Sequence, residues 1–368
     1  MKFFLIAGEV SGDNHGGIMI KAIKNACPAA EFQIIGGTSM ENAAGVSSII
    51  SIRQMAFMGF IQVIFKLTSI LKWIKTTQAA ITAYQPDVVV LIDYPGFNLR
   101  IAKWAKSQNF KVAYYISPKV WAWNKSRVYD IKKYVDQMFC ILPFEKAFYA
   151  KYDYEVSYFG NPLLDEIFTF QKDPDFLFKH GFDKPILALL PGSRIQEINR
   201  ILPSMLEAAK HFPQYHWVIP RSPNLDIHLI LPLIPTEMVS RVMILENDYF
   251  NLLSYARLAL VTSGTATLET ALFKVPQVVC YKTGALTYCL AKQLVELKFI
   301  SLVNLIADKE VVKELIQNNC NPKSLVEELT LLASLSEEAY IHFYDGLMKE
   351  MGKAGSAKRV AEALVAMA

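Results

Sequence analysis

Residues 86–98 read Pro86-Asp87-Val88-Val89-Val90-Leu91-Ile92-Asp93-Tyr94-Pro95-Gly96-Phe97-Asn98, and this stretch decides the fold. The apolar run of strand length that Pro86 opens and Asp93 ends is typical of a parallel strand buried on both faces. A turn rich in Pro and Gly follows the run, and a helix is predicted over residues 98–108. One strand, one turn and one helix in this order indicate an α/β protein.

The same alternation continues on both sides of this unit. In the first half we predict strands at Phe3–Ala7, Phe32–Ile35, Lys111–Ile116 and Gln137–Leu142, and helices over 16–26 and, as one long helix or a broken pair, 57–84. After a connector over 161–185 the alternation restarts, with strands at Pro185–Leu190, Tyr215–Ile219, Val242–Leu245, Leu258–Val261 and Pro276–Tyr281, helices over 199–211, Tyr249–Tyr255 and 264–273, and a helical end over 323–368. This order predicts doubly wound parallel sheets.

The chain length of 368 residues suits two domains of this kind. We place a first Rossmann-like domain at 1–165, a second at 166–340 and a C-terminal helix at 341–368, and leave open whether that helix packs back on the first domain. Ligands of open parallel sheets bind at the carboxyl ends of strands, so a cleft between the two domains is the expected site.

Composition excludes several classes of protein. Apolar residues make up 52% of the chain and the net charge is only +4, so neither disorder nor nucleic-acid binding is indicated. The five cysteines are scattered, which is typical of free thiols in a reducing compartment. We see neither a signal peptide nor an apolar run of roughly 18 residues, and therefore expect a cytoplasmic protein.

Three segments of the first half carry candidate site residues. Glu9, Ser11 and Asp13 lie in a Gly-rich turn that suits an anionic or hydroxyl-rich ligand; the alternative is a tight turn in which Ser11 or Asp13 caps the helix. Asp93 is a candidate general base at a strand end, or else begins an Asx turn, and Asn98 follows in the same segment. Trp121, in a loop with a second tryptophan, either stacks on a sugar ring or packs under the cleft.

The second half has two candidate phosphate segments. Arg194 follows a buried strand, and its permanently charged guanidinium suits a phosphate. Ser263, Gly264 and Thr265 end another strand and begin a helix, which predicts an anion site for a diphosphate. Glu269, farther along that helix, can accept hydrogen bonds from ribose hydroxyls. Asp173-Pro174-Asp175 has the spacing of a metal-binding pair but lies in the polar connector, so we expect no metal site.

Seven motifs taken together resemble one family. They are GEVSGD, IDYPGFN, SPKVWAW followed by Arg127-Val128, LPFEKAFY, LPGSR, SGTATLE and Val303-Asn304-Leu305-Ile306-Ala307, in an order that is similar to the lipid-A-disaccharide synthases over residues 4–360. The resemblance implies a GT-B fold, no cofactor and an inverting, metal-independent transfer. In that reaction UDP-2,3-diacylglucosamine is joined through a β-1,6 bond to 2,3-diacylglucosamine 1-phosphate, and UDP is released. It also implies peripheral association with the cytoplasmic face of the inner membrane.

The resemblance assigns roles by position. Asp93 matches the family's candidate catalytic carboxylate, and Arg194, Glu269 and Asn304 match its nucleotide-side residues. The first domain would then bind the acceptor and supply the base, and the second would bind UDP. Gly96 stands where the family often has a second Asp, and Asn161 stands where it often has His, so no role is carried over to either position.

Two other classes remain open. A nucleotide-sugar epimerase or a transferase of peptidoglycan-precursor assembly would share the UDP half of the chain and differ in the motifs of the first domain. A non-catalytic nucleotide- or lipid-binding module would not need Asp93 at a strand end, and would release no UDP. Acyl-chain preference, a homodimer and the residue that binds the acceptor phosphate are left open.

Residues 57–74 are apolar around nearly the whole circumference of the predicted helix. Such a helix is either fully buried or faces something other than water. Lys66, Lys72 and Lys75 punctuate the segment, and Trp73 is of a type favoured at the membrane interface. We therefore predict that this helix contacts the membrane, with burial in the core as the alternative.

Overall fold

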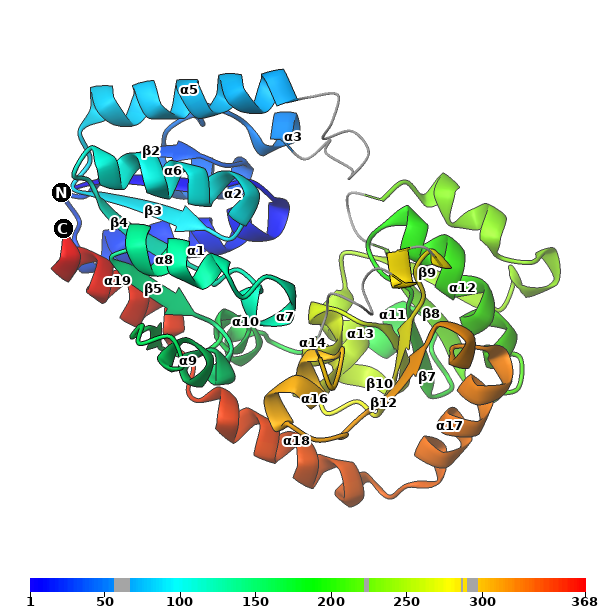
Figure 1. Ribbon diagram of the computed structural model, residues 1–368. Coiled ribbons are helices and arrows are strands. Elements are labelled where there is room, and N and C mark those ends of the chain that lie inside the picture. Colours follow the sequence, from blue (N-terminus) through cyan, green and yellow to red (C-terminus); the bar gives the residue numbers. More distant parts are fainter. Residues whose placement is uncertain (56–66, 222–224, 286, 290–296) are drawn as a thin grey trace. The chain divides into compact units, whose positions relative to one another are not determined.

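Two parallel six-stranded sheets form the framework of the computed structural model, which describes residues 1–368 except 56–66, 222–224, 286 and 290–296 (Figure 1). The chain divides into two compact units. The first comprises Met1–Phe168 with Met351–Ala368, and the second comprises Thr169–Glu350. The predicted α/β class with two Rossmann-like domains is confirmed.

The sheet of the first unit has the order β2-β1-β3-β4-β5-β6, with every neighbouring pair parallel. Its strands are β1 (Lys2–Ala7), β2 (Glu31–Ile35), β3 (Val88–Ile92), β4 (Lys111–Tyr115), β5 (Gln137–Cys140) and β6 (Ser157–Tyr158). β3 lies between β1 and β4, and all five of its residues are buried, as its unbroken apolar sequence predicts. The loops that follow β1, β3 and β4 therefore meet at one edge of the sheet.

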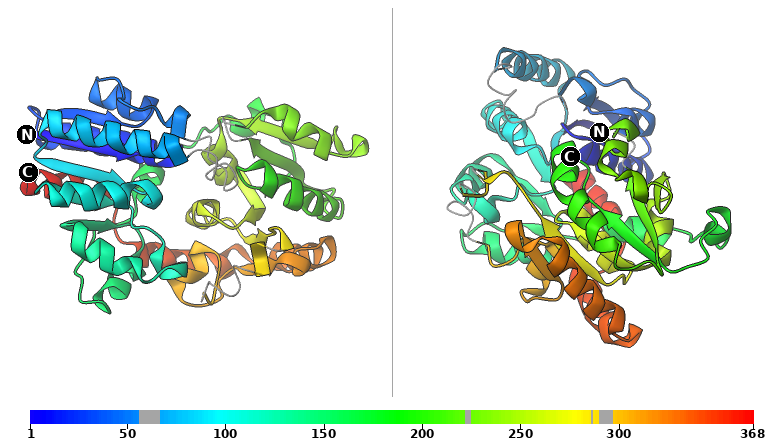
Figure 2. Two further views of the ribbon diagram at one scale, coloured as in Figure 1. Left: turned by 45° about the horizontal axis from the view of Figure 1, so that its top comes forward. Right: turned by 90° about the vertical axis from the view of Figure 1, so that its right-hand side faces the viewer.

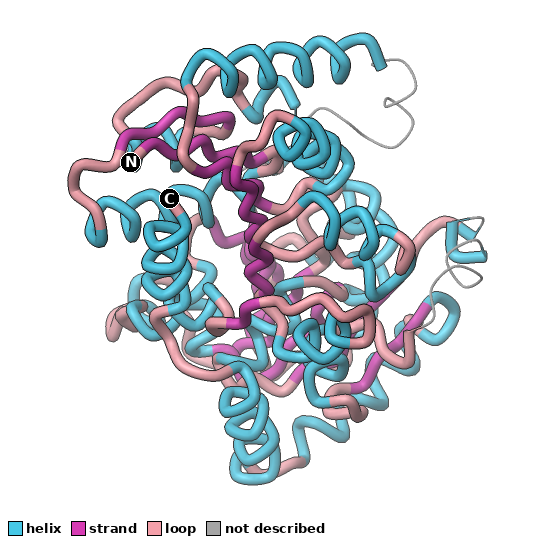
Figure 3. The backbone as a smooth tube through the Cα atoms, turned by 60° about the vertical axis from the view of Figure 1, so that its left-hand side comes forward, coloured by secondary structure: helices cyan, strands magenta, loops and turns pink. Residues whose placement is uncertain are grey.

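Helices cover both faces of this sheet, as Figure 3 shows with the strands in magenta and the helices in cyan. One face packs against α5 (Leu67–Tyr84), α6 (Pro95–Ser107) and α8 (Arg127–Tyr134), and the other against α1 (Val10–Ala26), α2 (Thr38–Ala44) and α19 (Ser356–Met367). Shorter helices of the unit are α3 (Ile52–Met55), α7 (Val120–Trp123), α9 (Pro143–Ala150) and α10 (Pro162–Thr169).

The last helix, α19, belongs to the first unit although the second unit precedes it in the chain. Val360, Ala361 and Leu364 are buried with residues of α1, so the two chain termini lie near each other (Figure 2). The Asp165 carboxylate in α10 accepts hydrogen bonds from the amides of Ser356 (3.2 Å) and Ala357 (3.0 Å). These bonds satisfy donors that the start of a helix leaves unpaired, and so fix where α19 begins.

The sheet of the second unit has the order β12-β11-β10-β7-β8-β9, again with parallel neighbours. Its strands are β7 (Ile186–Leu190), β8 (His216–Arg221), β9 (Val242–Glu246), β10 (Ala256–Thr262), β11 (Gln277–Tyr281) and β12 (Lys313–Ile316). α12 (Ile195–Ala209) and α17 (Pro322–Ser334) cover one face, whereas α11 (Phe176–Lys179) and α13 (Tyr249–Tyr255) cover the other. The unit also contains α14 (Thr265–Leu272), α16 (Leu302–Ala307), α18 (Glu337–Met351) and the short 3-10 turns η1 (Ile227–Leu229), η2 (Leu231–Leu233), η3 (Thr236–Met238) and η4 (Gln317–Asn319).

The structure adds elements that the sequence analysis did not predict. Residues 161–185, interpreted as a connector, contain α10 and α11, because apolar residues such as Leu164 and Phe176 are buried in the two units. α1 begins at Val10 rather than at residue 16, and β12 and α16 were not predicted as separate elements.

Only part of the predicted membrane helix can be compared with the structure. Residues 57–66 lie outside the described residues. In the described remainder, Ile70, Trp73 and Ile74 pack against the core of the first unit, whereas Leu71 is 53% exposed. Among the helices that the structure describes, none has both the length and the apolarity needed to cross a bilayer.

Candidate active site

Asp93 directly follows β3, and its backbone is held in an unusual conformation. Both Asp93 and Tyr94 have positive φ angles, 46° and 49°, which non-glycine residues rarely adopt. The Asp93 carbonyl accepts hydrogen bonds from Asn98 Nδ2 (2.8 Å) and from the Tyr114 hydroxyl, and its amide donates to the Tyr115 carbonyl (3.0 Å). Three contacts thus fix the strained turn that carries the Asp93 side chain, a feature typical of functional sites.

The electrostatic surroundings of Asp93 make it a weaker acid than usual. Burial and the nearby charge of Glu9 raise the pKa of the Asp93 carboxyl to about 6, although Lys119 and the Tyr94 amide act in the opposite direction. A carboxylate whose pKa lies this close to neutrality is suited to take up a proton at physiological pH. The carboxyl ends of β1, β3 and β4 therefore bring Glu9, Asp93 and Lys119 together.

The Gly-rich turn after β1 distributes its polar residues between solvent and core. Glu9 is the N-cap residue of α1 and makes no side-chain capping bond, and both Glu9 and Ser11 are exposed. Asp13 is buried, and its carboxylate accepts hydrogen bonds from the amides of Gly37 (2.7 Å), Ser39 (3.0 Å) and Met40 (3.1 Å). Neither Ser11 nor Asp13 caps its own helix, and Asp13 instead holds the start of α2.

The two tryptophans of the loop after β4 have different environments. Trp121 is buried, and its Nε1 donates to Glu145 Oε1 (3.1 Å), while its ring packs edge-on against Phe144. Burial raises the pKa of the Glu145 carboxyl to about 7. The burial of Trp121 favours the alternative in which it packs under the site over the one in which it stacks on a sugar ring. Trp123, in contrast, is 52% exposed.

In the second unit the start of α14 is open to solvent. Gly264 is the N-cap residue, Gly264 and Thr265 are exposed, and no atom lies within 4 Å of the position where a Gly264 side chain would begin. The Ser263 hydroxyl, in contrast, donates to the Ile300 carbonyl (2.9 Å). The backbone amides of this helix start can therefore donate hydrogen bonds to an anion, whereas the Ser263 hydroxyl is already bonded within the protein.

Arg194 and Glu269 carry charge at the surface of the second unit. The Arg194 side chain is 73% exposed and forms a 3.1 Å ion pair with Glu197. An ion pair this exposed contributes about 0–1 kcal/mol, so the guanidinium can turn to a ligand at little cost. Glu269 accepts a hydrogen bond from the Tyr249 hydroxyl (2.7 Å), and that hydroxyl is buried enough to raise the pKa of Tyr249 well above its usual value.

Asn304, by contrast, is fully buried and fully hydrogen-bonded inside the protein. Its Oδ1 accepts from the amides of Val311 (2.7 Å) and Val312 (2.9 Å). Its Nδ2 donates to the Val312 carbonyl (2.8 Å) and to Glu314 Oε1 (2.9 Å). Glu314 also accepts from the amide of Ser301, the N-cap residue of α16, at 2.9 Å. The Asn304 amide joins α16 to β12 and has no atom left for a nucleotide.

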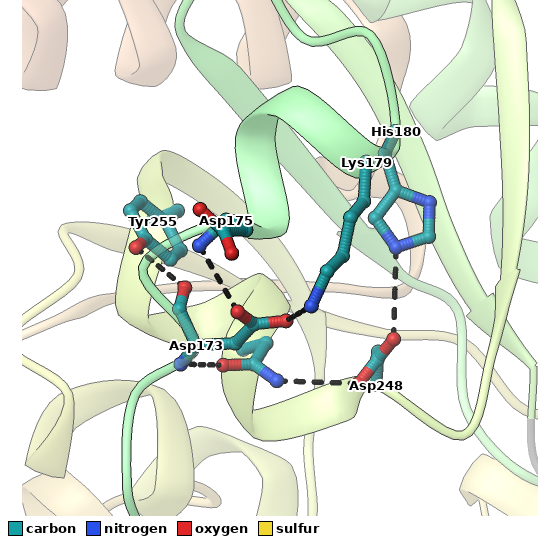
Figure 4. Close-up of polar contacts among 7 residues, drawn as sticks. Asp173, Asp175, Lys179, His180, Asp248 and Tyr255 are labelled. Carbon is teal, nitrogen blue, oxygen red and sulfur yellow. Dashed lines mark hydrogen bonds and ion pairs between the residues drawn. The ribbon is translucent and has the colours of Figure 1, made fainter.

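The Asp-Pro-Asp pattern of the connector is used to begin a short helix. Figure 4 shows the Asp173 carboxylate between the Lys179 ammonium (2.6 Å) and the Asp175 amide (3.0 Å). The hydrogen bond from Lys179 is the largest of the influences that lower the pKa of Asp173. Across the part of the chain that the structure describes, no three acidic, His or Cys side chains converge as metal ligands would.

Sequence reasoning missed residues that only the strand order makes evident. Lys119 and Tyr114 reach Asp93 because β4 pairs directly with β3. Knowing that β4 lies next to β3 would have been enough to place Lys119 near Asp93, because Lys119 lies in the loop that follows β4. Glu197 and Tyr249, the partners of Arg194 and Glu269, carried no signal that we can identify in the sequence.

Solved structures share this architecture. The UDP-GlcNAc 2-epimerase of Neisseria meningitidis bound to UDP-GlcNAc is similar over the full length of both chains, with a TM-score of 0.66 and 16% identity. The glycotransferase of kitacinnamycin is similar over 100% of this chain and 98% of its own, with a TM-score of 0.69 and 13% identity. At these identities the likeness defines the fold alone, which is the GT-B fold of glycosyltransferases and related epimerases.

Sequence comparison narrows this class to one family. Residues 3–365 match the model of the lipid-A-disaccharide synthetase family. The chain is 38% identical over 331 residues to the lipid-A-disaccharide synthase of Coxiella burnetii, covering 88% of this chain and 87% of that one. It is 35% identical over 372 residues to that of Myxococcus xanthus, covering 99% and 97%. The chain belongs to the lipid-A-disaccharide synthetase family, and it is a glycosyltransferase.

Proposed function

We propose that the chain transfers 2,3-diacylglucosamine from UDP to the 6-hydroxyl of 2,3-diacylglucosamine 1-phosphate, with inversion and without a metal. Asp93 acts as the general base that takes the proton of the acceptor hydroxyl. The observation that carries this proposal is the position of Asp93 at the end of β3, where burial and Glu9 raise its pKa to about 6. An inverting transfer requires one such base on the acceptor side.

The second unit supplies the groups that suit a leaving diphosphate. The exposed start of α14 offers backbone amides at Gly264 and Thr265, and Arg194 offers an exposed cation. Together these groups would stabilise the negative charge that develops on UDP, a role that a metal ion fills in other enzymes. Glu269, fixed by Tyr249, would accept hydrogen bonds from the ribose hydroxyls.

The remaining candidates fall into two groups. Glu9 and Ser11 are exposed in the turn after β1, and Glu9 is near enough to Asp93 to raise its pKa; both are proposed to face the acceptor. Asp13, Trp121, Ser263 and Asn304 have their polar groups engaged inside the protein, and the Asn98 Nδ2 is likewise bonded to the backbone of the Asp93 turn. We propose that these five residues position the site without touching substrate.

Association with the cytoplasmic face of a membrane is proposed for the first unit, because the substrates carry acyl chains. Its support lies in the apolar sequence of 57–74 and in the exposure of Leu71 beside two exposed lysines, Lys72 and Lys75.

The test is incubation of the purified chain with UDP-2,3-diacylglucosamine and 2,3-diacylglucosamine 1-phosphate, with UDP and disaccharide followed together. Equal amounts of both products are expected, with a β linkage by NMR and undiminished rate after exhaustive EDTA treatment. An epimerase would instead interconvert UDP-sugars, and a binding module would release no UDP. Loss of activity in EDTA that Mg²⁺ or Mn²⁺ restores would contradict the metal-independent mechanism.

A further inference from the structure

A cavity of about 260 Å³ lies beside the turn that carries Asp93. Its wall is formed by the N-terminal part of α6, including Gly96, Arg100 and Lys103, and by α8, including Arg127 and Asp130. All of these residues belong to the first unit. The volume lies just below the range of roughly 300–1,000 Å³ that is usual for small-molecule sites, so it suits one phosphate group with part of a sugar better than a whole nucleotide sugar.

The wall of this cavity is positively charged. The lining contains three cations, Arg100, Lys103 and Arg127, and one carboxylate, Asp130. Within the described part of the chain none of these three cations forms an ion pair. Two of them rest on aromatic rings instead. The Arg127 guanidinium lies 5.0 Å from the centre of the Trp123 ring, and the Lys103 ammonium lies 5.9 Å from that of Tyr134. Contacts with ring faces orient the cations but leave their charges uncompensated.

The cavity is also close to the proposed base. Gly96 is three residues from Asp93 in the same turn, and no atom lies within 4 Å of where a Gly96 side chain would begin. The Tyr114 hydroxyl donates to the Asp93 carbonyl. Burial raises the pKa of Tyr114 well above its usual value, the nearby charge of Asp93 raises it further, and the charge of Arg127 lowers it. One phenol group thus lies near the base and near the cavity wall.

We propose that this cavity binds the phosphate monoester of the acceptor, held by Arg100, Lys103 and Arg127. The inference rests on the proposed function, which requires an acceptor that carries a phosphate. Arg127 is suited to a bidentate contact with two phosphate oxygens, and Arg100 and Lys103 add charge from the neighbouring helix. The positive end of the α6 dipole points the same way. Binding the phosphate here would keep the acceptor sugar beside Asp93.

The decisive variant is Arg100→Gln combined with Lys103→Gln. Both side chains are exposed, so folding should be retained. The matched control is Lys106→Gln, which removes a charge from the same helix at a residue that pairs with Asp136 outside the cavity. Transfer is measured with the phosphorylated acceptor and with the same sugar lacking the phosphate.

The double variant should raise KM for the phosphorylated acceptor about 10-fold or more. It should leave KM for the UDP-sugar unchanged and lose the preference for the phosphorylated acceptor. The control should behave as wild type.

A second measurement separates failure of the cavity from failure of the function. Calorimetry with glucosamine 1-phosphate and with glucosamine should show binding of the first to the wild type and weaker binding to the double variant. If the wild type transfers nothing, the proposed function fails. Calorimetry still shows whether the cavity binds a sugar phosphate. Unchanged phosphate binding and an unchanged acceptor preference in the double variant would overturn the proposal. So would a loss of binding to phosphatidylglycerol vesicles without a change in acceptor KM, which would assign the cations to a lipid surface.

Discussion

The ring of Tyr94 lies directly against the α-carbon of Gly8: a β-carbon built on Gly8 would be 2.2 Å from the ring. Tyr94 belongs to the strained turn after β3, and Gly8 begins the turn after β1. The absence of a side chain at residue 8 therefore allows the two turns to pack at the edge of the sheet where Glu9 and Asp93 meet.

Gly8→Ala should destabilise the protein and lower activity, because the added methyl group must displace the Tyr94 ring. Overpacking of this kind typically costs about 1–3 kcal/mol in free energy of unfolding. The control is Gly96→Ala, at a glycine with open space around it. Thermal unfolding of both variants is the measurement, and equal midpoints would mean that the two turns separate easily.

Asp93→Asn should reduce kcat by about 10²–10⁴-fold while UDP binding persists, because the amide cannot accept the proton. In the wild type, kcat/KM should fall as pH drops below about 6, since the carboxyl is then protonated. Rate profiles from pH 5 to pH 9 test both statements. Retention of more than about a third of wild-type kcat would remove Asp93 from the role of base.

The same substitution should stabilise the fold at neutral pH. The pKa of the Asp93 carboxyl is raised from the usual Asp value of 3.8, which holds in the unfolded chain, to about 6 in the native protein. The native state therefore binds the proton more tightly than the unfolded state does. Wild-type stability therefore decreases as pH rises from about 4 to 6, and Asp93→Asn avoids this loss. The gain at pH 7.5 should be about 1–3 kcal/mol and should vanish near pH 4. Urea unfolding at both pH values decides it, and a variant that is less stable at pH 7.5 would show that the carboxylate is well solvated.

Patterns local in sequence predicted much of the fold. The strand before Asp93 was recognisable because five consecutive apolar residues are buried on both faces of the sheet, and Tyr249–Tyr255 forms the helix predicted for it. α10 was missed because its role is non-local: Asp165 holds the start of α19, about 190 residues away in the chain.

The candidate site was predictable where a residue ends a strand and not where burial decides its role. The position of Asp93 at the end of β3 was predicted from the sequence, and its role as a base stays a prediction. Trp121 and Trp123 are indistinguishable in sequence, yet the first is bonded to Glu145 in the core and the second is exposed. The partners of Asn304 could not be foreseen either, because they depend on β12, which was not predicted.

Arg194→Ala should weaken UDP binding roughly 10- to 150-fold, the effect of losing a charge-assisted hydrogen bond of about 1.5–3 kcal/mol. Lys210→Ala, a surface charge just past the other end of α12, is the control. Calorimetric titration with UDP is the measurement. Equal affinities in the two variants would move the diphosphate away from Arg194.

Glu269→Gln should likewise weaken UDP binding if the carboxylate accepts from ribose. Tyr249→Phe is the matched control, since it removes the 2.7 Å hydrogen bond between the two side chains and leaves the carboxylate in place. We expect a larger loss of UDP affinity in Glu269→Gln than in Tyr249→Phe. The reverse order would indicate that Glu269 serves only to hold α13 against α14.

Asn304→Ala should affect stability and not nucleotide recognition. The substitution leaves the part-buried Val311 amide, the buried Val312 amide, the Val312 carbonyl and the Glu314 carboxylate without the partner that Asn304 provides. Each unsatisfied buried group costs about 1–3 kcal/mol, and since such costs are not additive we expect a total of about 2–4 kcal/mol. Asn318→Ala, at an exposed asparagine of the nearby turn η4, should cost less than about 0.5 kcal/mol.

Below its melting transition the Asn304→Ala variant should bind UDP with an affinity within about twofold of wild type, because in the wild type the Asn304 side-chain amide reaches no ligand. A variant that melts like wild type but binds UDP tenfold more weakly would instead give Asn304 a direct contact with the nucleotide.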